Sequence, residues 1–168
     1  MDLHEIDPFV RSTANVFRTM LECEIECVRV CRKGNDTRQF DITGAIGLSG
    51  TRSGSVVLSL SSEAAYKVTE YFLMEVVTAM NDDVIDVVGE LVNMAAGGAK
   101  AELAEDNLCL GLPTVIVGDR HSIALPKIIE PVCAELGTPW GPAELEVGLA
   151  PVSEVLGAVD AHLEVVPV

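Results

Sequence analysis

The stretch DVIDVVGELVN, residues 83 to 93, carries the polar residues best placed to do chemistry. Asp86, Glu90 and Asn93 interrupt an otherwise apolar run at intervals of four and three residues. A carboxylate accepts hydrogen bonds and pairs with cations, whereas a side-chain amide both donates and accepts. At about 100° per residue, the three side chains fall within an arc of roughly 60° on a helix. The spacing therefore predicts a polar stripe along one helix face.

The rest of this helix, predicted to run from about Asp82 to Glu105, has a core face opposite the stripe. That face comprises Val84, Val87, Val88, Leu91, Met94 and Ala95. Two carboxylates at this spacing usually form a solvated face, and a surface that meets a partner is the alternative. Gly89, Ala96 and Gly97 lie beside the stripe. Because glycine inside a helix costs about 1 kcal/mol relative to alanine, they predict a close approach by another backbone, either the chain's own or a docked partner's.

The elements that must hold this helix alternate between strand-like and helix-like patterns. Further helices are predicted at 6–21 and 61–74, and strands at 22–33, 38–50, 54–60, 108–118, 127–136 and 143–151. The glycines of SGTRSGS (49–55) indicate a tight turn rather than a phosphate-binding loop. This order predicts an α+β fold, a largely antiparallel mixed sheet covered by long helices. We expect one domain over 1–168, with the apolar segment 152–168 packed on it as a C-terminal extension.

Composition excludes several classes of function. A net charge of −15 argues against binding to nucleic acid or to an anionic membrane surface. No apolar run approaches the roughly 20 residues of a membrane span, and MDLHEIDPFV lacks the basic start of a signal peptide, so a cytoplasmic protein is expected. Cys23, Cys27 and Cys31 recur every four residues, which places them on one face of a strand. We interpret them as reduced, small apolar side chains and expect no metal site.

The motif helix also resembles a known family. The pattern Asp-x3-Glu-x2-Asn, followed by MAAGGAKAEL and by LGLPTVIVG (110–118), is similar to the CheC/CheX/FliY phosphatases of bacterial chemotaxis, and to the CheX branch in particular. The segments IDPFVRSTANVFRTML, GAIGLSGTRSGSVVLSL and WGPAELEVGL resemble CheX segments as well. The likeness covers roughly residues 5 to 150. One copy of the Glu/Asn motif is visible, as in CheX.

This resemblance implies a CheC-like fold and a phosphatase of two-component signalling. Its substrate would be the aspartyl phosphate of a CheY-like receiver domain. Carried over by position, Asn93 would hold the attacking water, and Glu90 would pair with the receiver's active-site lysine. Asp86 and Gly97 would have supporting roles in docking. The Mg²⁺ would belong to the receiver, so the chain would need no cofactor of its own. A homodimer is also implied.

Two other classes of function remain open. The first is a catalytically silent relative that binds a receiver domain or acts as a dimeric scaffold. The second is an unrelated small-molecule binder built on an α+β domain. Phosphate release from a phosphorylated receiver, measured with and without the protein, separates the enzyme from both.

Overall fold

The computed structural model describes residues 1–33, 40–118, 121, 123 and 125–160. The strands are β1 (Glu26–Arg32), β2 (Ile42–Ser49), β3 (Arg52–Leu60), β4 (Cys109–Leu110), β5 (Thr114–Val117), β6 (Val132–Thr138) and β7 (Gly141–Pro151). The α-helices are α1 (Asp7–Met20), α2 (Ser62–Leu73), α3 (Asp82–Glu102) and α4 (Val152–Asp160), with short 3₁₀ turns η1 (Leu3–Ile6) and η2 (Ala104–Asp106).

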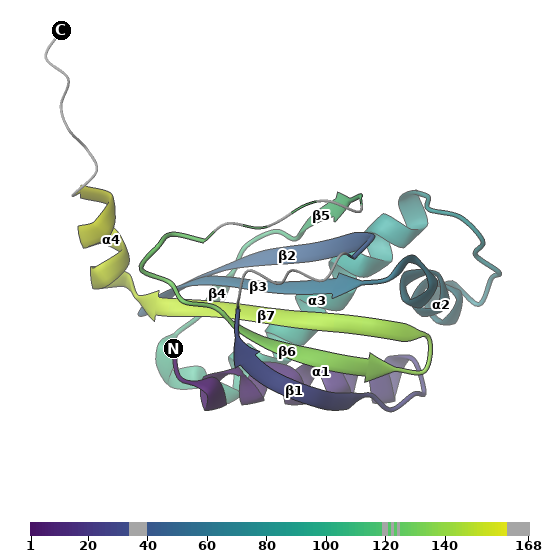
Figure 1. The fold of residues 1–168 in the computed structure, drawn as a ribbon, viewed down its shortest axis with the longest axis horizontal. Coiled ribbons are helices and arrows are strands. Elements are labelled where there is room, and N and C mark those ends of the chain that lie inside the picture. Colours follow the sequence, from purple (N-terminus) through teal and green to yellow (C-terminus); the bar gives the residue numbers. More distant parts are fainter. Residues whose placement is uncertain (34–39, 119–120, 122, 124, 161–168) are drawn as a thin grey trace, which may run out of the picture.

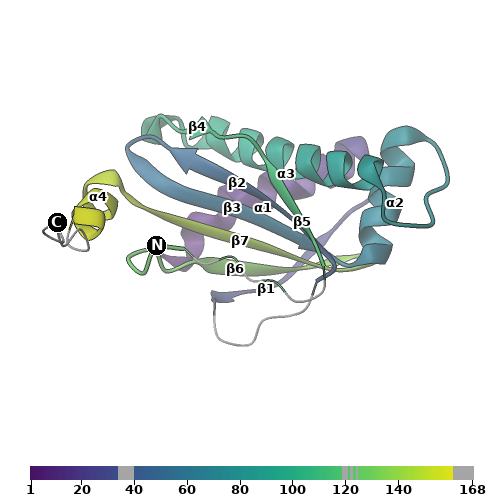
Figure 2. The same cartoon turned by 90° about the horizontal axis from the view of Figure 1, so that it is seen from above.

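The strands form one seven-stranded sheet with the order β1-β6-β7-β3-β2-β4, and β5 also pairs with β2. Each of these pairings is antiparallel. Helices α1 and α3 lie side by side along one face of the sheet, and α2 lies at the end of that face (Figures 1 and 2). The predicted α+β fold with long covering helices is confirmed, and the described sheet is antiparallel throughout.

The strand predicted at 108–118 is divided in two. β4 and β5 pair with different parts of β2, and Gly111 to Pro113 lie between them. Proline has no N–H to donate to a strand ladder, so the pairing is interrupted there. The Gly111 N–H still donates to the Gly47 carbonyl at 2.8 Å, which holds the break against β2. The predicted turn at 49–55 is confirmed as the connection of the β2–β3 hairpin.

Helix α1 packs closely against α3, the helix that carries the polar stripe. A Cβ atom added at Gly98 of α3 would lie 2.2 Å from Ser12 Oγ of α1, so a larger residue there would force the Ser12 side chain to move. Arg11 of α1 also donates to Glu102 of α3 at 2.7 Å. The glycine-rich end of α3 therefore serves, in part, the close approach of a helix within the same chain.

The two faces of the sheet have different environments. The face under the helices carries a continuous apolar core from β2, β3, β6 and β7, including Ile46, Val56, Leu58, Ala134, Leu145 and Val147. The opposite face carries the buried polar residues Thr43 and Glu146 and the buried thiol Cys133. Part of this face is covered by the segment before β6, because Leu125 and Ile129 lie directly over Gly148.

The placement of Cys23, Cys27 and Cys31 on one strand face is wrong. Cys23 precedes β1 and packs partly against the apolar core. A register shift between Cys27 and Arg29 interrupts the alternation within β1. Cys31 instead lies opposite Cys133 of β6. The period of two holds only along an unbroken strand, and a bulge resets it.

Helix α4 leads away from the end of β7 (Figure 1). Its side chains Val152 and Leu156 are 38% and 59% exposed. Residues 161–168 of the predicted extension lie outside the described residues, and its packing onto a single domain stays a prediction. Within the described residues, no helix is long and apolar enough to cross a membrane.

Candidate active site

The motif helix α3 begins with a well-formed N-terminus. The Asn81 side chain accepts a hydrogen bond from the Val84 N–H at 3.0 Å. Asp82 and Asp83 follow in the first turn, where carboxylates interact favourably with the helix dipole. The helix ends at Glu102, three residues before the predicted end, and η2 takes up the following residues.

Close packing on β2 fixes the rotation of α3 about its axis. A Cβ atom at Gly44 of β2 would lie 3.0 Å from Val92 Cγ1 and 3.1 Å from the Val88 carbonyl oxygen. Because a side chain at position 44 would push the helix away, glycine allows α3 to lie directly on the strand. Val88, Leu91 and Val92 are fully buried there. The opposite side of the helix must therefore face outward.

The core face of α3 agrees with the prediction except at its margins. Val84, Val87, Val88, Leu91 and Ala95 are buried as expected. Met94 is only half-buried, whereas Val92, which the prediction left out of the core face, is fully buried. The buried arc of α3 is therefore rotated towards Gly44 of β2. The sequence pattern of α3 alone does not predict this rotation.

The polar stripe occupies the outward side of α3. Asp86 and Glu90 are exposed, and Asn93 is half-buried. Asn93 Nδ2 donates a hydrogen bond to Glu90 Oε2 at 3.3 Å. This contact joins the two motif side chains and leaves Glu90 Oε1 and the Asn93 amide oxygen outside that bond. A carboxylate and an amide thus lie side by side on the surface. The carboxylate can pair with a cation, and the amide oxygen can accept a hydrogen bond from a water.

The small residues beside the stripe have different neighbours. Gly89 is buried, and a Cβ atom there would be 3.4 Å from Val115 Cγ2, an ordinary contact made by the chain's own β5. A Cβ atom at Gly97 would have only Leu110 Cδ1 near it, at 3.9 Å. The close approach predicted for this region is therefore made by α1 at Gly98. Gly97 itself leaves an open position in line with the stripe.

A hollow continues the stripe beyond Gly97. It has a volume of about 730 Å³ and is lined by Gly97, Lys100, Ala101, Ala104, Asn107, Leu108, Cys109 and Leu110. Leu112 is 89% exposed and stands next to Pro113, which faces Gly89. Leu112 was not among the site residues predicted from the sequence. A large apolar residue between glycine and proline in a short break between strands was the available signal.

The sequence matches the family model described as chemotaxis phosphatase CheX over residues 42–136. This range includes β2, β3, the whole of α3 and most of β6. The chain belongs to the CheX family. The resemblance inferred from the motif helix is thereby confirmed. Among curated proteins, none matches this chain.

Solved structures of the same kind agree with this assignment. A CheC-like superfamily protein from Shewanella sp. PV-4 is 27% identical, with a TM-score of 0.82 over 89% of this chain and 99% of that one. CheX from Vibrio vulnificus is 29% identical, with a TM-score of 0.81 over 87% and 99%. A CheX–CheY–BeF₃–Mg²⁺ complex from Borrelia burgdorferi shares the fold at 20% identity, with a TM-score of 0.71 over 88% and 99%.

Proposed function

We propose that this protein hydrolyses the aspartyl phosphate of a CheY-like receiver domain, with Glu90 and Asn93 as the catalytic residues. The observation that carries the proposal is the pair itself. In a CheX-family chain, the two side chains stand adjacent on the outward face of α3, joined by a hydrogen bond of 3.3 Å. In the Borrelia burgdorferi structure, a CheX of the same fold is in complex with CheY.

The reaction asks little covalent chemistry of the protein. Water attacks the phosphorus in line, a new P–O bond forms, and the bond to the aspartyl oxygen breaks to give phosphate and a free carboxylate. An acyl phosphate is already activated, so the catalyst chiefly holds the water in line. The Asn93 amide can do this with its oxygen as acceptor and its nitrogen as donor, and it does not titrate near neutral pH.

Glu90 would fix the docking register by pairing with the lysine of the receiver's active site. Its carboxylate is exposed, so it carries no desolvation penalty in the free protein. Asn93 uses one carboxylate oxygen, and the other is available to a partner ammonium group. Asp86, one turn earlier and also exposed, would support docking by its charge. The reaction's Mg²⁺ would be held by the receiver.

The surroundings of the stripe suit a protein partner. Gly97 leaves room for close approach, and the hollow beyond it opens onto the same side of α3. Leu112, in the connection between β4 and β5, offers a further exposed apolar contact. We further propose a homodimer, because β1 lies at the end of the sheet order and is mostly exposed, and no strand among the described residues pairs with its outer edge.

Phosphate release tests the proposal. A purified CheY-like receiver is phosphorylated with a small-molecule phosphodonor, and free phosphate is followed with and without catalytic amounts of the protein. The expected result is multiple-turnover release above the receiver's own rate. Binding to the phosphorylated receiver without any acceleration would instead support the silent, receiver-binding alternative.

A further inference from the structure

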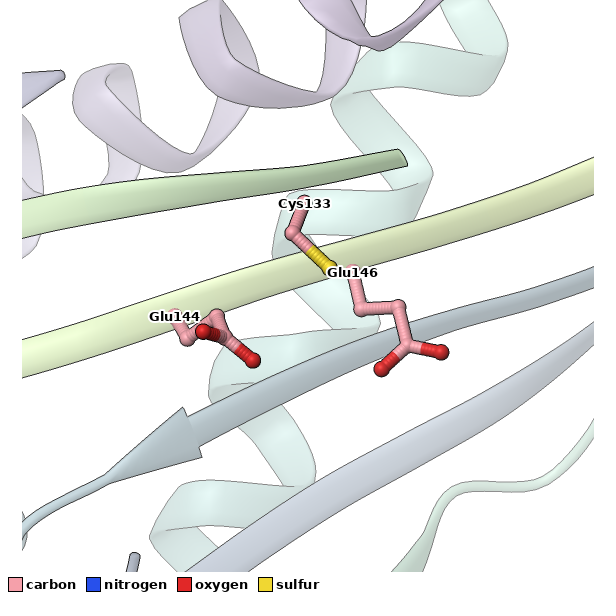
Figure 3. Close-up of side chains that lie close together, drawn as sticks. All are labelled: Cys133, Glu144 and Glu146. Atoms are coloured by element: carbon pink, nitrogen blue, oxygen red, sulfur yellow. The ribbon is translucent and has the colours of Figure 1, made fainter. Parts of the chain in front are cut away.

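A second group of reactive side chains lies on the sheet face turned away from the helices. Cys133 of β6 is directly opposite Glu146 of β7, and Glu144 is two residues before Glu146 on the same strand. One ligand atom from each of the three lies within 4.8 Å of the others. Figure 3 shows their side chains projecting together from β6 and β7, with the helices behind the sheet.

Two members of this cluster are almost completely buried. Cys133 and Glu146 are each 4% exposed, and Glu144 is half-buried. Glu146 Oε2 forms an ion pair with Lys33, which follows β1. Glu146 Oε1 is buried and has no hydrogen-bond partner among the described residues. A buried carboxylate oxygen without a partner loses its hydration for no compensating bond, so its position calls for a ligand.

The chemistry of the three side chains selects the kind of ligand. The carboxylates beside the buried thiol would repel an anion, so the ligand is a cation. Burial, together with the nearby Glu146 and Glu144, raises the pKa of Cys133 to about 12, so the thiol keeps its proton while no metal ion is bound. One thiolate and two carboxylates form a ligand set that Zn²⁺ accepts, whereas Mg²⁺ and Ca²⁺ take oxygen ligands.

We propose that Cys133, Glu144 and Glu146 bind a divalent transition metal ion, with Zn²⁺ as the best fit. On binding, the metal forms a bond to sulfur and the thiol proton passes to solvent. Glu146 contributes the oxygen that is unpartnered in the metal-free chain, and the fourth position is open to water. This site differs from the expectation, drawn from sequence, that the chain has no metal ligands, and it is independent of the proposed phosphatase activity.

The geometry needs only a small adjustment. Tetrahedral zinc with bonds of about 2.0 to 2.3 Å holds its ligand atoms roughly 3.5 Å apart. The present limit of 4.8 Å can close by side-chain rotation, because glutamate has flexible torsions and the strands β6 and β7 already fix the three Cα positions in register. The Lys33 ammonium group is paired with the other oxygen of Glu146, so its positive charge competes electrostatically with a metal cation on the same carboxylate, and its removal gives a sharp test.

The test uses the full chain, without an affinity tag, reduced and stripped of metal by a chelator. Zn²⁺ affinity is measured by competition with a chromophoric chelator, and Co²⁺ is added as a spectroscopic probe of thiolate ligation. We expect one ion per chain and a sulfur-to-cobalt charge-transfer band. Cys133→Ser should abolish the band and weaken Zn²⁺ binding by on the order of 10-fold or more. Glu146→Gln should weaken Zn²⁺ binding to a similar extent.

Two further variants separate this site from adventitious binding. Cys109→Ser removes an exposed thiol of β4 and should leave the Zn²⁺ affinity and the cobalt band unchanged. Lys33→Met removes the competing ammonium group and should tighten Zn²⁺ binding. Circular dichroism establishes that each variant is folded. If Cys133→Ser does not fold, Cys133→Ala takes its place. A folded wild-type chain that binds no Zn²⁺, or a Cys133 variant that keeps the cobalt band, would overturn the proposal.

Discussion

Removing the charge of Glu90 tests whether this carboxylate fixes the docking register. Glu90→Gln keeps the shape of the side chain and an oxygen that can still accept from Asn93 Nδ2. It removes only the negative charge offered to the receiver's lysine. Because Glu90 is exposed in the free protein, the change should leave the free energy of unfolding within about 0.5 kcal/mol of wild type.

The expected magnitude follows from the geometry of the pair. One oxygen of Glu90 is engaged by Asn93, so a single charge-assisted hydrogen bond to the partner is lost, worth about 1.5–3 kcal/mol when water is excluded on docking. This corresponds to roughly a 10- to 150-fold decrease in kcat/KM for phosphate release. The control is Asp86→Asn, which removes the same charge one turn earlier on the same exposed face.

The assay is a titration of receiver concentration, repeated with a receiver whose active-site lysine is replaced by alanine. In a double-mutant cycle the two changes should be strongly non-additive, because they remove the same contact. If Glu90→Gln and Asp86→Asn have equal, small effects, or if the cycle is additive, Glu90 makes no specific pair with that lysine.

Three further predictions concern the framework. Gly44→Ala should destabilise the fold by about 1–3 kcal/mol in chemical denaturation, because the added Cβ meets Val92 and Val88 of α3. Gly47→Ala, where nothing lies within 4 Å of the added Cβ, should be nearly neutral. Equal effects of the two changes would contradict the close packing. The pKa of Cys133 is raised from 9.0 to about 12, so above pH 9 the unfolded chain loses this proton first and stability should fall between pH 9 and about 12, by up to roughly 1.4 kcal/mol per pH unit. Cys133→Ala in metal-free protein should remove that part of the slope, and an unchanged slope would refute the assignment. Light scattering should report a dimer at micromolar concentration, and a monomer would contradict the sheet-edge proposal.

The polar stripe of α3 could be predicted from the sequence alone. The spacing of Asp86, Glu90 and Asn93 is enough to place them on one face, because a helix maps sequence onto angle in a fixed way. Which way that face points depends on what lies beneath the helix. The motif stretch carries no information about Gly44, which lies 39 residues before its first residue, and so the burial of Val92 and the partial exposure of Met94 could not be predicted from it.

The strands show the same limit. Alternation located most of them, but the division at Gly111 to Pro113 and the bulge after Cys27 depend on pairing with particular neighbours. The cluster of Cys133, Glu144 and Glu146 also escaped the sequence, because Cys133 and Glu146 meet only through the antiparallel register of β6 and β7. Long-range register is decided by the whole sheet, and a residue-by-residue pattern cannot supply it.

In the proposed mechanism, Asn93 positions the water that attacks an aspartyl phosphate. The decisive measurement is the rate of phosphate release at saturating phosphorylated receiver, for wild type and Asn93→Ala, with receiver binding measured in parallel. We expect nearly equal binding and a maximal rate lower by on the order of 100-fold or more in the variant, since the amide acts on water only in the reacting complex. An Asn93→Ala protein that turns over at the wild-type rate would contradict it.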